Sequence, residues 1–229
     1  MDTREKLLSV STATLTTQLF KRGFRNVFIH GLRPLNPARD RLCGPAFTLR
    51  YIPAREDLDH IGVFEDRSHP QRVAIEQCPA GAVLMIDSRG DSLAASAGGI
   101  LITRLMVRGA AGIVTDGGLR DTPEIARIDF PSFCRAASAP TNLIRHHAVG
   151  INEPIGCGGV AVYPGDIAVG DGDGVVIIPA HLADEVAEAS WQQERFEEFV
   201  TEKVREGRSI FGLYPPDAAT KAEYEARRK

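Results

Sequence analysis

The sequence has no long hydrophobic run and no excess of basic residues, and each absence excludes a class of protein. A membrane-spanning helix needs about 18 or more consecutive apolar residues, and no stretch of this chain reaches that length. Its first residues also lack the apolar segment of a signal peptide. The formal net charge is −3, with 27 Lys and Arg against 30 Asp and Glu, whereas nucleic-acid-binding domains normally carry a basic stripe. We therefore expect a cytoplasmic protein that binds neither a membrane nor nucleic acid.

Cysteine is scarce and widely spaced. The four cysteines are Cys43, Cys78, Cys134 and Cys157, and no two of them form a Cys-x-x-Cys pair. This spacing argues against a disulfide framework and against a structural zinc site. We expect four small, buried thiols in a reducing compartment.

One stretch of the chain predicts a glycine loop, a helix, a strand and a charged loop within a single βαβ unit. Gly98 and Gly99 are poor helix formers, so they predict a loop before a helix that runs from Ile100 to about Arg108. The first turn of that helix presents free backbone N–H groups to an anion, and glycines allow close approach. Residues 112–115 follow as a short apolar strand. With 229 residues, of which 43% are hydrophobic, the chain can bury an α/β core as one domain, residues 1–229.

Charged residues follow two strands of this region. The strand just described leads into Asp116, Arg120 and Asp121, and an earlier apolar strand, 82–86, leads into the charged loop 87–91. Ligands of parallel sheets bind outside the carboxyl ends of the strands, so we expect both loops to face one crevice. Arg120 can hold a carboxylate with two parallel N–H bonds, and Asp121 offers hard oxygen to Mg²⁺ or Mn²⁺. Together they indicate a 2-oxo-acid site.

Other interpretations of these residues are weaker. In isolation, an Arg beside an Asp is a surface ion pair that contributes little, but the glycine loop and the βαβ spacing around Arg120 and Asp121 favour a site. The segment from Gly90 to Gly99 lacks the spacing of a dinucleotide-binding loop. The dense carboxylates of 166–173 fail the EF-hand spacing and are typical of turns.

The N-terminal half predicts a helix, a strand and a surface segment. Ser11 or Thr12 can cap a helix that reaches Arg22. Residues 45–51 alternate as a strand does. The polar segment 56–70 predicts a loop or short helix near the mouth of the site.

The C-terminal half predicts a strand series, a long helix and a tail. The strands are expected at residues 160–163, 167–169 and 175–178. Apolar residues at a spacing of three to four predict an amphipathic helix from about 182 to 206, broken near Trp191. A solvated helix is the first interpretation of this pattern, and packing of its apolar stripe on another subunit is the alternative. The charged segment 217–229 is expected to be a frayed tail.

Several of these residues recur in one family pattern. They are Arg108-Gly109, Gly112-Ile113-Val114, Arg120-Asp121, Pro164-Gly165-Asp166 and Asp171-x-x-Gly174. In these motifs the chain resembles, over nearly its whole length, the RraA-like family of 4-hydroxy-4-methyl-2-oxoglutarate aldolases and ribonuclease E activity regulators. The resemblance implies an α/β fold related to the phosphohistidine swivelling domain, a βαβ sandwich or barrel with N- and C-terminal helices. It also implies a homotrimer or homohexamer with active sites between subunits.

The resemblance further implies a metal-dependent pyruvate aldolase that also decarboxylates oxaloacetate. By this likeness, Arg120 binds the carboxylate or oxo group of the 2-oxo acid, and Asp121 binds Mg²⁺ or Mn²⁺. The backbone amides that hold the substrate carboxylate fall on Gly98, Gly99, Ile100 and Leu101.

The family pattern includes two further acidic positions. The aldolases carry an acidic residue in the place of Gly99, and that carboxylate helps to order water around the metal. Asp91 or Asp116 could supply a replacement. A further acidic residue comes from the C-terminal helix of a neighbouring subunit, and it falls on Glu197 or Glu198.

Three functions remain open from the sequence. The first is a divalent-metal lyase acting on a small 2-oxo acid. The second is a non-catalytic regulator that binds a protein such as a ribonuclease, which Gly99 favours and the Arg-Asp pair opposes. The third is a dehydratase or hydrolase of sugar-derived oxo acids on the same scaffold. The sequence sets neither the carbon skeleton beyond the oxo-acid head nor the general base.

Overall fold

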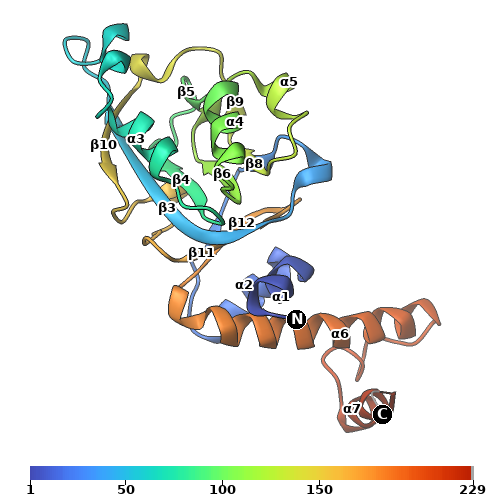
Figure 1. Cartoon of the computed structure of the whole chain (residues 1–229). Coiled ribbons are helices and arrows are strands. Elements are labelled where there is room, and N and C mark those ends of the chain that lie inside the picture. The colour runs from blue at the N-terminus through green and yellow to red at the C-terminus, as the bar shows by residue number, and fades with distance from the viewer. Residues whose placement is uncertain (228–229) are drawn as a thin grey trace.

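The computed structural model describes residues 1–227 and has an α/β fold (Figure 1). Its strands are β1 (Phe28–Ile29), β2 (Arg33–Pro34), β3 (Leu42–Pro53), β4 (Val83–Asp87), β5 (Ala95–Ala97), β6 (Gly112–Thr115), β7 (Gly118–Leu119), β8 (Ser132–Cys134), β9 (Ala136–Ala137), β10 (His146–Ile151), β11 (Ile167–Asp171) and β12 (Gly174–Ile178). Within these residues, a nine-stranded sheet has the order β1-β12-β11-β3-β4-β6-β8-β2, with β10 also paired to β3. A three-stranded sheet has the order β5-β7-β9.

Helices lie at both ends of the chain and on the faces of the sheets, so the predicted α/β class is confirmed (Figure 1). The α-helices are α1 (Thr3–Ser9), α2 (Thr12–Lys21), α3 (Pro70–Gln77), α4 (Gly99–Val107), α5 (Thr122–Ile125), α6 (Ala183–Arg205) and α7 (Ala218–Arg227). The 3₁₀ helices are η1 (Pro37–Arg39), η2 (Ile61–Glu65), η3 (Asn142–Ile144), η4 (Cys157–Gly159) and η5 (Ala180–Leu182). None of the helices in residues 1–227 is long and apolar enough to cross a membrane.

The middle of the large sheet is parallel and buried. β3, β4, β6 and β8 run in the same direction, with Val83 opposite Gly112. Every residue of β4 and β6 is buried, as expected for parallel strands covered on both faces. The predicted strands 82–86 and 112–115 are therefore confirmed within one residue. The predicted strand 45–51 is the central part of the longer β3.

α3 and α4 cover one face of this parallel centre. Ile75 of α3 and Ile102 of α4 pack into the same core as Leu84 of β4. α4 has Gly98 as its N-cap, so the helix predicted over 100–108 is confirmed within one residue. β4, α4 and β6 form the predicted βαβ unit, and the parallel pairing of β5 with β7 places the start of α4 beside Arg120.

α1, α2 and the first half of α6 cover the antiparallel strands β11 and β12. Ser11 caps α2 by accepting a hydrogen bond from the Thr14 backbone N–H, which confirms the predicted start of that helix. The sequence analysis does not predict α1, which begins with a capping box between Asp2 and Glu5. The buried side chains of this layer include Leu15, Leu19, Val169, Val176 and Val186. The apolar stripe on the first half of α6 is therefore covered by the chain's own N-terminal helices.

Residues 160–163 do not form the predicted strand. They follow η4 and make an isolated bridge, between Val162 and Ile155. Val160 and Val162 are buried in the core, so their alternation reflects the packing of an irregular segment and not a sheet ladder. The other two predicted strands are confirmed as β11 and β12.

α6 is one continuous helix of 23 residues, so the predicted break near Trp191 is wrong. Trp191 is half-buried, and the guanidinium carbon of Arg195 lies 4.8 Å from its ring centre. The indole therefore packs along the helix without interrupting it.

The predicted frayed tail is also wrong for most of its length, because residues 218–227 form α7. Tyr224 of α7 packs edge-on against Phe196 of α6, with ring centres 5.1 Å apart, and Arg208 pairs with Glu223 at 2.5 Å. These contacts order the charged segment. Residues 228–229 lie outside the described part of the chain.

All four cysteines are free and buried, as predicted. Burial raises the pKa of the Cys43 and Cys78 thiols to about 11. Thiolate chemistry at these residues is therefore disfavoured.

Candidate functional site

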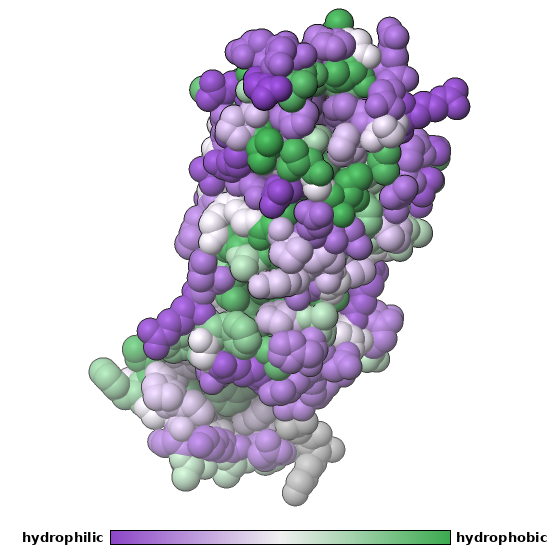
Figure 2. All heavy atoms as spheres, turned by 90° about the vertical axis from the view of Figure 1, so that its left-hand side faces the viewer, coloured by the Kyte–Doolittle hydropathy of each residue, from purple (hydrophilic) through white to green (hydrophobic). Residues whose placement is uncertain are grey.

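A cavity of about 730 Å³ lies at the start of α4. Its walls come from η2, α3, the segment from β5 into α4, the loop after β7, and η3. Five predicted site residues line it: Gly98, Ile100, Leu101, Arg120 and Asp121. On the face shown in Figure 2, the larger apolar areas lie in the upper part of the molecule, which holds the sheets. The structure thus brings the predicted glycine loop and the Arg-Asp pair together.

Arg120 and Asp121 pack directly on the two glycines. The Arg120 Nε lies 3.7 Å from the Asp121 Oδ2, and the Gly99 backbone N–H donates to that same oxygen at 3.0 Å. A Cβ added to Gly98 would lie 2.8 Å from the Asp121 Oδ2 and 3.0 Å from the Arg120 Cγ. A side chain at position 98 would therefore displace both functional groups.

Asp121 has a left-handed backbone conformation, with φ 60° and ψ 30°. That conformation is uncommon for a residue with a side chain and is often found at functional sites. Asp121 stands at the N-cap of α5, yet its side chain makes no capping bond to α5. Instead the carboxylate turns back to α4. The strained turn aims it at the cavity.

The amides of the first turn of α4 are less free than predicted. The Gly99 N–H is taken by Asp121, and the Leu101 N–H bonds back to the Gly98 carbonyl at 3.1 Å. Within residues 1–227, the Ile100 N–H has no hydrogen-bond partner. The Ile100 amide is thus the one best able to bind a substrate anion. The Gly99 and Leu101 amides, also predicted to bind it, already donate to other groups of the chain.

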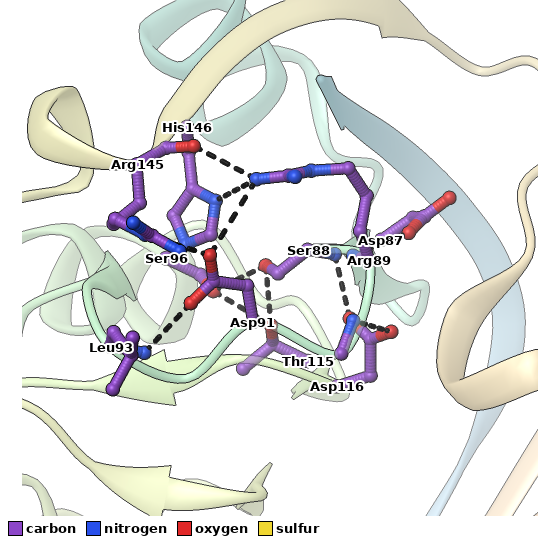
Figure 3. Close-up of polar contacts among 11 residues, drawn as sticks. Asp87, Ser88, Arg89, Asp91, Leu93, Ser96, Thr115, Asp116, Arg145 and His146 are labelled. Atoms are coloured by element: carbon purple, nitrogen blue, oxygen red, sulfur yellow. Dashed lines mark hydrogen bonds and ion pairs between the residues drawn. The ribbon is translucent and has the colours of Figure 1, made fainter. Parts of the chain in front are cut away.

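The charged loop 87–91 does not line the cavity, so its predicted convergence on the same crevice is wrong. Asp116 is 1% exposed and accepts a backbone N–H bond from Ser88 at 2.6 Å (Figure 3). It also accepts backbone N–H bonds from Gly90 at 2.7 Å and from Gly158 at 2.9 Å. Asp91 pairs with Arg145 at 2.8 Å. Both carboxylates are committed to loop structure, and neither replaces the acidic residue missing at Gly99.

A buried polar network supports the strand ends behind the cavity (Figure 3). The hydroxyls of Ser88, Ser96 and Thr115 lie within 2.7–3.1 Å of one another. His146 is fully buried, with its Nδ1 3.3 Å from an Arg89 nitrogen. Burial, followed by the Arg89 charge, lowers the pKa of His146. The network holds the ends of β4 and β6 in fixed positions.

Glu124 is an acidic residue that the sequence analysis missed. A Cβ added to Gly99 would lie 3.5 Å from the Glu124 Oε2 and 3.7 Å from the Asp121 Oδ2. Glu124 makes no ion pair within residues 1–227. Its carboxylate therefore faces the space that an acidic side chain at position 99 would enter. Its place in the helical turn after Asp121, at i+3, is the sequence signal that could have found it.

The two carboxylates fit a cation that is only partly held by protein. Mg²⁺ is usually bound by one or two carboxylates, with water and substrate completing its octahedron. The described residues contain no group of three or more His, Cys, Asp or Glu arranged to hold a metal. Asp121 and Glu124 are consistent with Mg²⁺ or Mn²⁺ and argue against a closed structural site.

The far wall of the cavity comes from residues that the sequence analysis did not single out. Gln71 and Arg72 of α3 line it together with Phe64 of η2 and Asn142 of η3. The predicted surface segment 56–70 does reach the cavity, because Ile61 and Phe64 of η2 line it. The signal for α3 was Pro70, since proline is favoured in the first turn of a helix.

Glu197 and Glu198 lie in the second half of α6 and do not line the cavity of their own chain. Glu197 accepts hydrogen bonds from the Gln193 side chain at 2.8 Å and from the Tyr214 hydroxyl at 3.1 Å. Glu198 is exposed and makes no hydrogen bond or ion pair within residues 1–227. α1, α2 and α7 of the same chain cover the apolar stripe of α6, so the stripe does not need another subunit to cover it.

Comparison with known proteins agrees with this fold. The sequence profile of the RraA-like family, described as Aldolase/RraA, matches residues 12–177. A Halalkalibacterium halodurans protein, provisionally named 4-hydroxy-4-methyl-2-oxoglutarate aldolase, is 34% identical over 171 residues, which cover 73% of each chain.

Two solved structures share the fold. RraAS2 of Streptomyces coelicolor, described as an unusual member of the RNase ES inhibitor RraA protein family, superposes with a TM-score of 0.77 at 29% identity, covering 86% of this chain and 94% of that one. An uncharacterised protein from Pseudomonas syringae pv. tomato has a TM-score of 0.79 at 24% identity, covering 93% and 96%; at that identity it supports the fold alone.

These findings define a class of α/β proteins whose relatives carry the names of aldolases and of ribonuclease inhibitors. The chain belongs to the RraA-like family.

Proposed function

We propose that the protein is a divalent-metal-dependent lyase that releases pyruvate from a small 2-oxo acid, by retro-aldol cleavage or by decarboxylation. The observation that carries this proposal is the packing of Arg120 and Asp121 on Gly98 and Gly99 at the cavity wall. Similarity to a provisionally named aldolase supports it.

Arg120 binds the carboxylate of the 2-oxo acid. Its side chain is 46% exposed, so its N–H groups can reach a ligand in the cavity and form two parallel bonds to a carboxylate. The Ile100 N–H and the positive end of α4 favour the same negative charge. Because Gly98 has no side chain, the substrate head can approach the backbone closely.

Mg²⁺ or Mn²⁺, held by Asp121 with Glu124 as the nearest second carboxylate, would supply Lewis-acid polarisation of the oxo group. Asp121 is prepared for this role because the Gly99 N–H fixes its Oδ2. Glu124 is exposed, and its Oε2 is free to hold a water molecule or take up a proton.

We further propose that the active form is a homotrimer or homohexamer in which an acidic residue of one chain approaches the cavity of the next. Glu198 suits this role better than Glu197, because Glu197 already accepts two hydrogen bonds within its own chain. A closed cyclic assembly would repeat such a contact at every interface.

A second candidate function is a non-catalytic regulator of a ribonuclease. Two observations favour it: the glycine at position 99 and the similarity to RraAS2, a member of an RNase inhibitor family. The Arg120–Asp121 pair and the open cavity favour the lyase. A dehydratase or hydrolase of sugar-derived oxo acids would use the same site and would differ in its product.

The experiment is a coupled assay of pyruvate release from oxaloacetate and from 4-hydroxy-4-methyl-2-oxoglutarate. The lyase predicts Mg²⁺-stimulated pyruvate from at least one of these substrates, abolished by excess EDTA. Pyruvate release at the uncatalysed rate with both, together with inhibition of a purified ribonuclease, would favour the regulator.

A further inference from the structure

Arg72 brings a second guanidinium into the cavity that Arg120 lines. It is half-buried on α3, and its guanidinium carbon lies 4.2 Å from the ring centre of Phe64. Within residues 1–227 it makes no ion pair with an acidic side chain. Stacking on Phe64 holds the cation in place but leaves its N–H groups available.

The charges lining the cavity do not balance. Two of the lining residues are arginines, Arg72 and Arg120, and Asp121 is the acidic residue among the described lining residues. Asp121 lies beside Arg120, at 3.7 Å, so the described lining of this cavity offers Arg72 no acidic side chain of its own. Burial lowers the pKa of Arg72, and the Arg120 charge adds to that effect. An anion in the cavity would relieve the repulsion between the two cations.

Two buried amide groups that line the cavity with Arg72 each have one atom without a hydrogen-bond partner. Gln71 is 2% exposed, and its Nε2 donates to the Ser96 carbonyl at 2.7 Å and to the Tyr51 hydroxyl at 3.1 Å. Because the Ser96 carbonyl can only accept, the amide nitrogen faces it, and the Gln71 Oε1 is left unbonded. Asn142 is 4% exposed, and its Nδ2 is unbonded. Buried polar groups are nearly always paired, so ligand atoms are their natural partners.

Resting on the proposed function, we propose that Arg72 is a specificity-determining residue that binds a second anionic group at the far end of the 2-oxo acid held by Arg120. The Asn142 Nδ2 donates to that far end, and the Gln71 Oε1 accepts from a hydroxyl on the carbon chain between the two anionic groups. The protein would therefore discriminate against 2-oxo acids that end in an alkyl group.

Two non-reacting probes of equal chain length test this subsite. 2-Oxoglutarate and 2-oxopentanoate share a five-carbon chain and an oxo-acid head, and they differ in having a carboxylate or a methyl group at the far end. Binding of each is measured by calorimetry in Mg²⁺ for the wild type, for Arg72→Gln and for Arg67→Gln. Arg67 is an exposed arginine just before α3 that does not line this cavity, so it controls for general loss of positive charge.

We expect the wild type and Arg67→Gln to bind 2-oxoglutarate at least about tenfold more tightly than 2-oxopentanoate. Arg72→Gln should bring the ratio close to one while leaving the affinity for 2-oxopentanoate unchanged. Melting curves check that each variant is folded.

Equal wild-type affinities, a preference retained in Arg72→Gln, or no binding of either probe would overturn the subsite. A preference that depends on Arg72 in a protein without lyase activity would leave the subsite standing and overturn the proposed function. The two failures are therefore distinguishable.

Discussion

Replacing Gly98 with alanine should damage the site while leaving the fold almost intact. Gly98 has φ −133° and ψ 179°, an extended conformation that alanine adopts without strain. The new Cβ, however, would lie 2.8 Å from the Asp121 Oδ2 and 3.0 Å from the Arg120 Cγ. Relaxed carbon–oxygen contacts are about 3.3–3.6 Å, so the carboxylate must move by about half an ångström or more.

The expected loss follows from that displacement. A shift of about 1 Å in a positioning group can cost on the order of 100-fold in rate, so we expect kcat/KM to fall by about 10- to 100-fold. The loss corresponds to about 1.4–2.7 kcal/mol of transition-state stabilisation. Alanine is a poorer N-cap than glycine by about 0.5–1 kcal/mol, which shifts Tm by no more than about 4 °C in a protein of this size.

Gly99→Ala is the matched control. Its Cβ would lie 3.5 Å from the Asp121 Cβ and from the Glu124 Oε2, which is ordinary contact, and alanine keeps the backbone N–H. The assay is Mg²⁺-dependent pyruvate release, with melting followed by circular dichroism. Wild-type kcat/KM in Gly98→Ala, or equal damage in Gly99→Ala, would refute the steric argument.

Four other predictions follow from the same geometry. Asp121→Asn should weaken Mg²⁺ activation by at least about tenfold, because a neutral amide does not offset the cation; an unchanged Mg²⁺ titration would remove Asp121 from the metal site. Light scattering at assay concentration should give a trimer or hexamer, and Glu198→Gln should lower kcat without changing the mass; an active monomer would contradict the shared site. Asp116→Ala strips three backbone N–H groups of a buried acceptor, so it should cost about 3 kcal/mol or more and lower Tm by about 6 °C or more; a smaller change would contradict a structural role. Burial lowers the pKa of His146 from 6.5, so the folded state disfavours the proton that the unfolded state binds. The free energy of unfolding should therefore be highest above pH 6.5 and fall as the pH drops below it. His146→Leu should flatten that part of the Tm–pH curve.

The βαβ unit could be predicted because local signals and the parallel-sheet rule agree there. The apolar runs of β4 and β6 are short and fully buried, and the glycines mark where α4 begins. β5 and β7 pair in parallel, with Ala97 opposite Leu119, and this pairing places Gly98, which follows β5, beside Arg120 and Asp121, which follow β7. The sequence therefore predicts the glycine loop, α4 and β6, but it does not predict β5 and β7, the short strands that bring Gly98 to Arg120 and Asp121.

The direction of a carboxylate could not be predicted from its position after a strand. Asp87 is the last residue of β4 and Asp116 follows β6, as active-site residues often do, yet both accept hydrogen bonds from backbone N–H groups. Some of the N–H groups that donate to these carboxylates come from a loop distant in sequence, such as that of Gly158, which donates to Asp116. Buried capping and catalysis thus use the same residue type at the same strand ends.

Long-range packing explains the other missed features. Arg72 and Asn142 reach the cavity from elements far from α4 in sequence, and neither stands in a periodic or motif context. α7 has a charged sequence, and its order depends on the aromatic contact between Tyr224 and Phe196 of another helix. Such pairings cannot be read from one segment alone.

The most direct test of the central claim is the rate of pyruvate release by wild type and by Arg120→Lys, each with Mg²⁺ and with excess EDTA. Lysine keeps the positive charge but cannot make the two parallel bonds of a guanidinium to a carboxylate. The account predicts Mg²⁺-dependent turnover by the wild type and a loss on the order of 100-fold in kcat/KM for Arg120→Lys. Wild-type turnover that persists in EDTA, or an Arg120→Lys variant with near-normal kcat/KM, would contradict it.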